Sequence, residues 1–189
     1  EALRCTVSFA GSLSDSHHGP PPRIELLKAI AAKYNIRIWG SSTRYLVNEE
    51  HSIMCNKSPI NLGHSGWPLV SLSQSARDYR IMAAGGFLLT NRVNNYDTIF
   101  AEGVHMERYN TIDECIEKIG YYKNNEKERD VIREIGMKET HDKHTFSHRM
   151  QRMLNIVFNQ KDDYDTEYED WHRFSPIGNK LTESNIPHK

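Results

Sequence analysis

Two arginines stand near the start of a predicted helix, where they could bind an anion. The helix begins after Ser75, a typical N-cap residue, and Asp78 three positions later completes the pattern of a capping box. Arg77 and Arg80 are three residues apart, so both lie on nearly the same face of the helix. The first N–H groups of a helix lack partners within it and carry the positive end of its dipole. Together these groups predict a site for a phosphate or another anion.

The residues that follow predict how this helix is held. Ile81 and Met82 give it an apolar side, and Gly85 and Gly86 end it because glycine adopts left-handed backbone without steric cost. The apolar run at 87–89 is typical of a central parallel strand. An ordinary helix packed on a sheet, with two solvated arginines, explains the same pattern, because every helix N-terminus can attract an anion.

Strand and helix patterns alternate along the first part of the chain. Residues 5–10 and 36–39 are β-rich runs, and between them an amphipathic helix follows three prolines and ends near Tyr34. This order is a βαβ unit, which implies parallel strands. It predicts an α/β fold, a Rossmann-like parallel sheet with helices on both faces.

Four residues come directly after these two predicted strands or end one of them. They are Gly11, Ser12, Trp39 and Gly40. Ligands of parallel sheets bind at the carboxyl ends of the strands, so these residues are predicted at the functional end of the sheet. The first loop is not a GxGxxG sequence, which disfavours a classical dinucleotide site.

The rest of the chain continues the pattern and then changes character. Residues 59–62, 86–90 and 105–109 read as strands, and helices are predicted at 111–119, 126–141 and from Thr145 to about residue 157. Residues 45–55 are ambiguous, with a short helix as one interpretation. We expect a Rossmann-like domain over 1–158 and an acidic, aromatic tail over 159–189.

Composition limits the possible functions. The 189-residue chain has a net charge of -1 and a pI near 6.9, which argues against a nucleic-acid binder. No apolar run is long enough to span a membrane, and no signal peptide is visible. Cys5, Cys55 and Cys115 are odd in number and far apart, which fits reduced cysteines of a cytoplasmic protein. Because the chain begins at Glu1, we expect a piece of something longer.

Metal and nucleophile chemistry have weaker support. His144 and His148 have the spacing that can bind zinc on one helix, but there is no HExxH or CxxC pattern, which favours surface histidines. We also interpret His17, His18 and His141 as surface histidines. The run 163–165 matches the DxD motif of some sugar transferases, although a solvated or docking tail explains it better. No GxSxG elbow is present.

Several of these segments together resemble one family. Residues 7–12, Arg23, 38–40, 60–62 and above all 77–90 are similar to the C-terminal domain of glycosyltransferases with the GT-B fold. The closest resemblance is to the group of the spore maturation protein CgeB, and it covers about residues 5–158. It implies the half of a glycosyltransferase that binds the nucleotide-sugar donor.

The resemblance implies a role for individual residues. The donor pyrophosphate would lie against the start of the helix at 75–84, with Arg77 on the phosphate side. Gly11-Ser12 would face the donor, Trp39-Gly40 would flank the base and Asn61 would lie on the rim beside the sugar. The full predicted donor-binding set is Gly11, Ser12, Trp39, Gly40, Asn61, Ser75, Arg77, Tyr79, Arg80 and Gly85, with no catalytic residue and no metal ligand.

The sequence departs from the family pattern at two positions. Tyr79 fills an expected aromatic position, but Arg80 replaces the glutamate that usually holds the ribose hydroxyls, and Leu72 replaces the preceding glutamate of the motif. An arginine cannot accept hydrogen bonds, so the ribose contact must be lost or replaced. The donor is therefore unusual, or this copy binds without turnover.

The resemblance also implies a missing part. A GT-B enzyme has two Rossmann-like domains, and this chain matches only the donor-binding one. We expect the partner to be an N-terminal acceptor-binding domain or another chain, the substrate to be a nucleoside-diphosphate sugar, and no metal to be obligatory. Two alternatives are a non-catalytic docking module derived from the same fold, and a structural domain that contacts a larger assembly through its tail.

Overall fold

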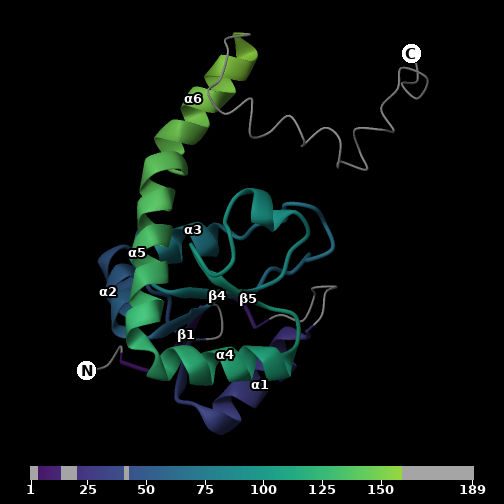
Figure 1. Ribbon diagram of the computed structural model, residues 1–189, viewed down its shortest axis with the longest axis vertical. Coiled ribbons are helices and arrows are strands. Elements are labelled where there is room, and N and C mark those ends of the chain that lie inside the picture. The colour runs from purple at the N-terminus through teal and green to yellow at the C-terminus, as the bar shows by residue number, and fades with distance from the viewer. Residues whose placement is uncertain (1–3, 14–20, 41–42, 159–189) are drawn as a thin grey trace, which may run out of the picture. The chain divides into compact units, whose positions relative to one another are not determined.

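The computed structural model describes residues 4–13, 21–40 and 43–158 (Figure 1). The chain divides into two compact units, Glu1–Thr145 and Phe146–Lys189. The first unit holds the sheet, and the described element of the second is helix α6 (Phe146–Val157). Residues 159–189 lie outside the described residues, so the predicted tail stays a prediction. The last predicted helix, which we assigned to the sheet domain, instead groups with the second unit.

Five parallel strands form the sheet of the first unit, in the order β2-β1-β3-β4-β5. They are β1 (Val7–Ala10), β2 (Ile36–Trp39), β3 (Ile60–Leu62), β4 (Leu88–Asn91) and β5 (Glu107–Tyr109). The chain adds β2 on one side of β1 and then β3 on the other side. The strand order therefore reverses next to β1, and ligands of open parallel sheets bind at the carboxyl ends of the strands at such a reversal.

Helices cover both faces of this sheet, as predicted for a Rossmann-like fold (Figure 1). The helices of the first unit are α1 (Arg23–Lys33), α2 (Glu49–Lys57), α3 (Ala76–Ala83), α4 (Ile112–Asn124) and α5 (Glu126–Lys143), with a 3₁₀ turn η1 (Tyr96–Thr98). Helices α1 and α4 lie on one face, and α2 and α3 lie on the other. Helix α5 packs against α3 and α4.

The two faces are closed by two hydrophobic clusters. Phe9 of β1 packs with Leu26 and Ile30 of α1, and all three are fully buried. On the other face, Leu88 of β4 packs with Ile81 of α3 in a second cluster. Burial of each such side chain contributes about 1.5–3 kcal/mol, so the helices are held firmly over the sheet.

The structure corrects several predicted boundaries. The ambiguous stretch at 45–55 contains a helix, α2, which begins at Glu49. The strand predicted at 86–90 begins at Leu88 and includes Asn91, and the strand predicted at 105–109 begins at Glu107. None of the helices in the described part of the chain is long and apolar enough to cross a membrane.

Candidate functional site

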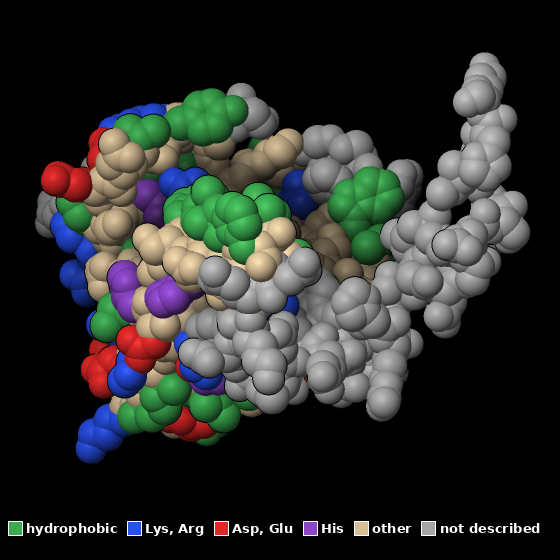
Figure 2. Space-filling model, turned by 90° about the horizontal axis from the view of Figure 1, so that it is seen from above, with side chains coloured by type: hydrophobic (Ala, Val, Ile, Leu, Met, Phe, Trp, Pro, Cys, Tyr) green, Lys and Arg blue, Asp and Glu red, His purple; other side chains and the backbone are tan. Residues whose placement is uncertain are grey.

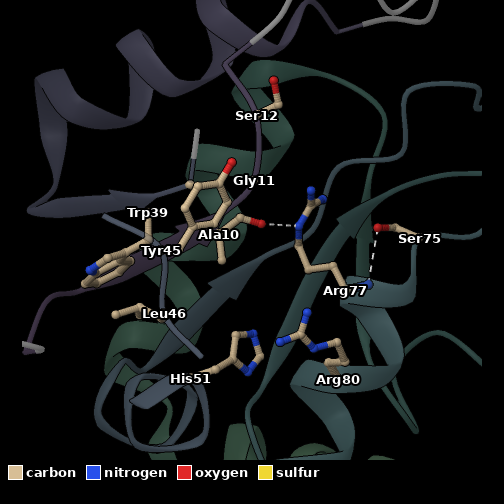
Figure 3. Close-up of a pocket in the computed structure, with 11 residues that line it drawn as sticks. Ala10, Gly11, Ser12, Trp39, Tyr45, Leu46, His51, Ser75, Arg77 and Arg80 are labelled. Atoms are coloured by element: carbon tan, nitrogen blue, oxygen red, sulfur yellow. Dashed lines mark hydrogen bonds between the residues drawn. The ribbon is translucent and has the colours of Figure 1, made fainter. Parts of the chain in front are cut away.

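A pocket of about 340 Å³ opens at the carboxyl ends of β1 and β2, in front of the start of α3 (Figure 3). We call it the α3 pocket. Its lining residues are Ala10, Gly11, Ser12, Trp39, Gly40, Tyr45, Leu46, His51, Ser75, Arg77 and Arg80. Among these described lining residues, the charged side chains are those of Arg77 and Arg80, and none is an aspartate or a glutamate. Seven of the ten residues predicted from the sequence line the pocket, while Asn61, Tyr79 and Gly85 do not.

Arg77 joins the two strands at which the strand order reverses. Its Nε donates to the carbonyl of Ala10 at the end of β1, and its Nη1 donates to the carbonyl of His64 after β3, 3.1 Å away. The guanidinium lies over the Phe9 ring, 4.9 Å from its centroid. Burial lowers the pKa of Arg77, and the adjacent Asp78 raises it. The side chain is thus fixed in place, with one side forming part of the pocket wall.

The start of α3 is capped as predicted, but the capping box does not form. Ser75 Oγ accepts a hydrogen bond from the backbone N–H of Arg77 at 3.3 Å. The carboxylate of Asp78 does not return to the cap, because its Oδ2 accepts a hydrogen bond from the hydroxyl of Tyr96 at 3.2 Å. Burial raises the pKa of Asp78 to about 6, against the opposing effects of Arg77 and Tyr96. The carboxylate of Asp78, at the start of α3, therefore points into the core.

The loops at Gly11 and Gly40 form another part of the wall of the α3 pocket. The backbone N–H of Gly11 donates to the carbonyl of Trp39 at 2.8 Å. Gly40 has a φ of +142°, and a Cβ at this position would stand 2.2 Å from the carbonyl oxygen of Gly11. Neither loop could approach the other so closely with a side chain at Gly40. The glycines thus allow the ends of β1 and β2 to open onto one cavity.

His51 and Arg80 form the remaining corner of the α3 pocket, and Figure 3 shows their side chains pointing toward one another. His51 is 6% exposed, and its Nδ1 lies 3.7 Å from the sulfur of Cys55. Burial lowers the pKa of His51, and Arg80 and Arg77 lower it further. His51 was not among the residues predicted from the sequence, because the secondary structure of residues 45–55 was ambiguous. The signal was present, since a helix after β2 begins at the carboxyl end of the sheet.

A second pocket of about 260 Å³, the Trp67 pocket, lies on the other side of Arg77. Its lining residues are Ser12, Arg23, His64, Ser65, Gly66, Trp67, Ser73, Gln74, Ser75 and Arg77. It shares Ser12, Ser75 and Arg77 with the α3 pocket. Arg23 fixes the backbone at Ser12, because its Nη1 donates a hydrogen bond to the carbonyl of Ser12 at 3.0 Å. One ligand could therefore extend across Arg77 into both pockets.

The structure corrects the expected place of three predicted residues. Asn61 is fully buried within β3, where its amide donates to the carbonyl of Cys55 at 3.0 Å and accepts from the hydroxyl of Ser8 at 2.7 Å, so it is not on the rim. The Tyr79 ring packs on Phe100, away from the pocket lining. Gly85, with a φ of +76°, follows the opposite end of α3 and ends that helix.

The histidines give no support to a metal site. Helix α5 ends at Lys143 and α6 begins at Phe146, so His144 and His148 do not share a helix. The His144 ring stacks on Phe100, with the two centroids 4.8 Å apart. Within residues 4–13, 21–40 and 43–158, no group of three or more His, Cys, Asp or Glu side chains could hold a metal. His17, His18 and the run 163–165 lie outside these residues.

Exposed hydrophobic side chains do not mark one site. The segment between β3 and α3 exposes Trp67, Leu69 and Val70, and α6 exposes Phe146 and Met150. On the face drawn in Figure 2, hydrophobic side chains are exposed among charged side chains and histidines. The α3 and Trp67 pockets, rather than an apolar surface, therefore define the candidate site.

Comparison with known proteins identifies the family. A sequence profile described as glycosyl transferase-like matches residues 23–155, which is more than two thirds of the chain. The chain belongs to this glycosyl transferase-like family. The matched region of this glycosyltransferase-like protein contains α1 to α5 and four of the five strands. No curated protein matches it in sequence.

Solved structures show the same fold at low sequence identity. An alpha1,3-fucosyltransferase with GDP-fucose has a TM-score of 0.58 and 14% identity, over 72% of this chain and 40% of its own. A glycosyltransferase from Rickettsia africae ESF-5 has a TM-score of 0.55 and 11% identity, and the match covers 86% of this chain and 40% of that one. TarM has a TM-score of 0.55 and 10% identity, and the match covers 80% of this chain and 34% of the TarM chain. The glycosyltransferase-like protein thus has the Rossmann-like fold of GT-B glycosyltransferases and spans 34–40% of the length of these chains.

Proposed function

We propose that this domain binds the nucleotide-sugar donor of a glycosyltransferase. The sugar would pass to an acceptor held by an N-terminal domain or a partner chain. The observation that carries the proposal is the α3 pocket, where the start of α3 and Arg77 face a cavity whose described lining residues include no aspartate or glutamate. The family match and the fold shared with a fucosyltransferase solved with GDP-fucose support it. Within the family, we favour the group that resembles CgeB.

In this proposal the donor lies across Arg77. Its diphosphate contacts the start of α3 and the Arg77 guanidinium, since helix N-termini and arginines both favour phosphate. The nucleoside lies in the α3 pocket beside Trp39 and Tyr45, and the sugar lies in the Trp67 pocket. The domain then stabilises the negative charge of the departing nucleoside diphosphate without an obligatory metal. Any catalytic base belongs to the acceptor-binding domain.

We also propose a cytoplasmic location. Cys5, Cys55 and Cys115 are all buried and unpaired with one another, as in proteins kept under reducing conditions. Burial raises the pKa of Cys55 and Cys115 to about 12, so both remain protonated and unreactive thiols.

A second candidate is a binding module that has kept the pocket and lost turnover. The observation that favours it is Arg80, an exposed cation in the pocket lining where the family resemblance leads us to expect a carboxylate. The two candidates share donor binding and differ in catalysis. Sugar transfer by the full-length protein supports the first candidate, whereas binding without transfer supports the second.

Donor binding is tested by calorimetric titration with UDP, GDP, CDP, ADP and dTDP. We expect one of them to bind, and Arg77→Ala to weaken it by about tenfold or more, because a charge-assisted hydrogen bond is lost. Arg133→Ala is the matched control, since Arg133 lies at the amino ends of the strands. Thermal melting of each variant shows that it is folded.

Equal affinity of the wild type and a folded Arg77→Ala variant would contradict the proposed site. If Arg77→Ala fails to fold, Ser75→Ala replaces it, because Ser75 lines both pockets and its hydroxyl is a potential phosphate ligand. We expect a smaller loss of affinity from this change, and no loss would count against the site.

A further inference from the structure

A second cationic corner of the α3 pocket has no role in the binding of a diphosphate at Arg77. We propose that His51 and Arg80 form an additional anion-binding subsite, which takes a phosphate group carried on the ribose of the nucleotide. This inference rests on the proposed function and deepens it, because it assigns a substrate class to the same pocket.

The first observation is the state of the two side chains. His51 is 94% buried, and within the described part of the chain its ring has only a weak contact, with the sulfur of Cys55 at 3.7 Å. The Arg80 guanidinium forms no hydrogen bond or ion pair with any described residue. The two side chains come from different helices, α2 and α3, and converge on one corner of the cavity (Figure 3). A buried imidazole without a strong partner is unusual, because buried polar groups normally form hydrogen bonds.

The second observation is the charge of the surrounding groups. Arg77 and Arg80 line the pocket together, and none of the other described residues in its lining is acidic. The nearby carboxylates are turned elsewhere, since Asp78 accepts a hydrogen bond from Tyr96 and Glu50 pairs with Arg44. A ribose hydroxyl would leave the charge of Arg80 uncompensated, whereas a phosphate monoester would supply about 1.5–2 negative charges. The corner therefore fits an anion better than it fits a neutral diol.

The position of the corner selects the ribose as the source of the anion. With the diphosphate at Arg77 and the base beside Trp39 and Tyr45, the ribose lies between them, over His51 and Arg80. A carboxylate on the transferred sugar would present the same chemistry. It would, however, lie in the Trp67 pocket, on the other side of Arg77 and away from this corner.

The test compares UDP, GDP, CDP and ADP with their 2′- and 3′-phosphorylated forms, and dTDP with its 3′-phosphorylated form, by calorimetric titration. We expect one ribose-phosphorylated form to bind about tenfold tighter than its parent, as for an added charge-assisted hydrogen bond. Arg80→Gln and His51→Gln should each remove this advantage, so that the parent and its phosphorylated form bind each variant with equal affinity. Arg133→Gln, an equal loss of charge outside the pocket, should retain the advantage.

The alternative outcomes are distinct. The subsite would be overturned if the wild type bound the parent and phosphorylated forms with equal affinity, or if folded Arg80→Gln and His51→Gln variants kept the preference for the phosphorylated form. In either case, binding of the parent diphosphates that depends on Arg77 would still support the proposed function. Binding of no nucleotide in either form would overturn both. A preference for UDP-glucuronate over UDP-glucose that depends on Arg80 would assign the corner to an acidic sugar and overturn the ribose phosphate.

Discussion

The two ends of the sheet each carry a pocket rich in basic residues, and they differ in how the basic charge is balanced. The pocket at the amino ends of the strands, with about 540 Å³, is larger than the α3 pocket, with about 340 Å³. Its basic residues are Arg4, Lys57, Lys123, Arg129 and Arg133. Arg129 Nη2 lies 3.0 Å from Glu126 and Arg133 Nε lies 3.8 Å from Asp130, so carboxylates of the same pocket neutralise both.

Helix direction explains the difference. Lys57 and Lys123 stand in the last turns of α2 and α4, where a cation stabilises the negative end of the helix dipole. Arg77 stands in the first turn of α3, where a cation is unfavourable unless an anion joins it. Lys57 and Lys123 thus stabilise their helices, whereas the position of Arg77 favours a bound anion.

The largest effect that we expect concerns the close contact between Gly40 and the Gly11 backbone at the carboxyl end of the sheet. Gly40→Ala should destabilise the fold by about 4 kcal/mol, because it combines a strained φ with a clash against the Gly11 backbone. Gly103→Ala is the matched control, since Gly103 has a φ of +74° but its Cβ would be 3.7 Å from the nearest atom. It should cost about 1 kcal/mol. Denaturant unfolding measures both, and equal losses would show that the carboxyl end is no more tightly packed than an open loop.

A smaller effect concerns Asp78, the acid that is turned away from the pocket. Its folded-state pKa is raised to about 6, mainly by burial, so its contribution to stability is fully present below about pH 4 and is lost as the pH rises through about 6. The loss should approach about 3 kcal/mol. Denaturant unfolding between about pH 4 and about pH 8 measures it. Asp78→Asn should be less sensitive to pH than the wild type, and identical pH profiles would disprove the assignment.

The smallest effect concerns His51 and the affinity for a bound anion. Burial lowers the pKa of His51, with Arg80 and Arg77 adding to the shift. A bound phosphate would raise that pKa, so binding takes up a proton and strengthens as the pH falls. Between about pH 7.5 and about pH 5.5 we expect the affinity of the wild type to rise about fivefold relative to His51→Gln. Parallel pH profiles in the two proteins would exclude His51 from the site.

The sequence predicted the parts of the site that depend on local chemistry. The Ser75 cap, the glycine termination of α3 and the position of Arg77 follow from short-range rules of helix formation. Strand order along the chain also predicted that Gly11 and Gly40 would lie at the functional end of the sheet. These features need no knowledge of which distant side chains pack together.

The errors concern side-chain direction within a buried element. Asn61 lies in a strand that is covered on both faces, so alternation along the strand did not show that its amide would bond to Ser8 and Cys55. Asp78 matched a capping box, but its partner, Tyr96, lies far along the chain and forms a hydrogen bond that the pattern cannot reveal. His51 was missed because the segment before α2 has no clear periodicity. Such contacts are set by tertiary packing.

The central claim is that a nucleoside diphosphate binds at the carboxyl end of the sheet and not in the larger basic pocket. Nuclear magnetic resonance of the isotope-labelled protein, titrated with the diphosphate that binds tightest, tests it most directly. We predict that the backbone amide signals of Gly11, Ser12 and Arg77 shift and that those of Thr6 and Lys57 do not. Shifts confined to Thr6, Lys57 and their neighbours would contradict the claim and place the ligand at the amino end.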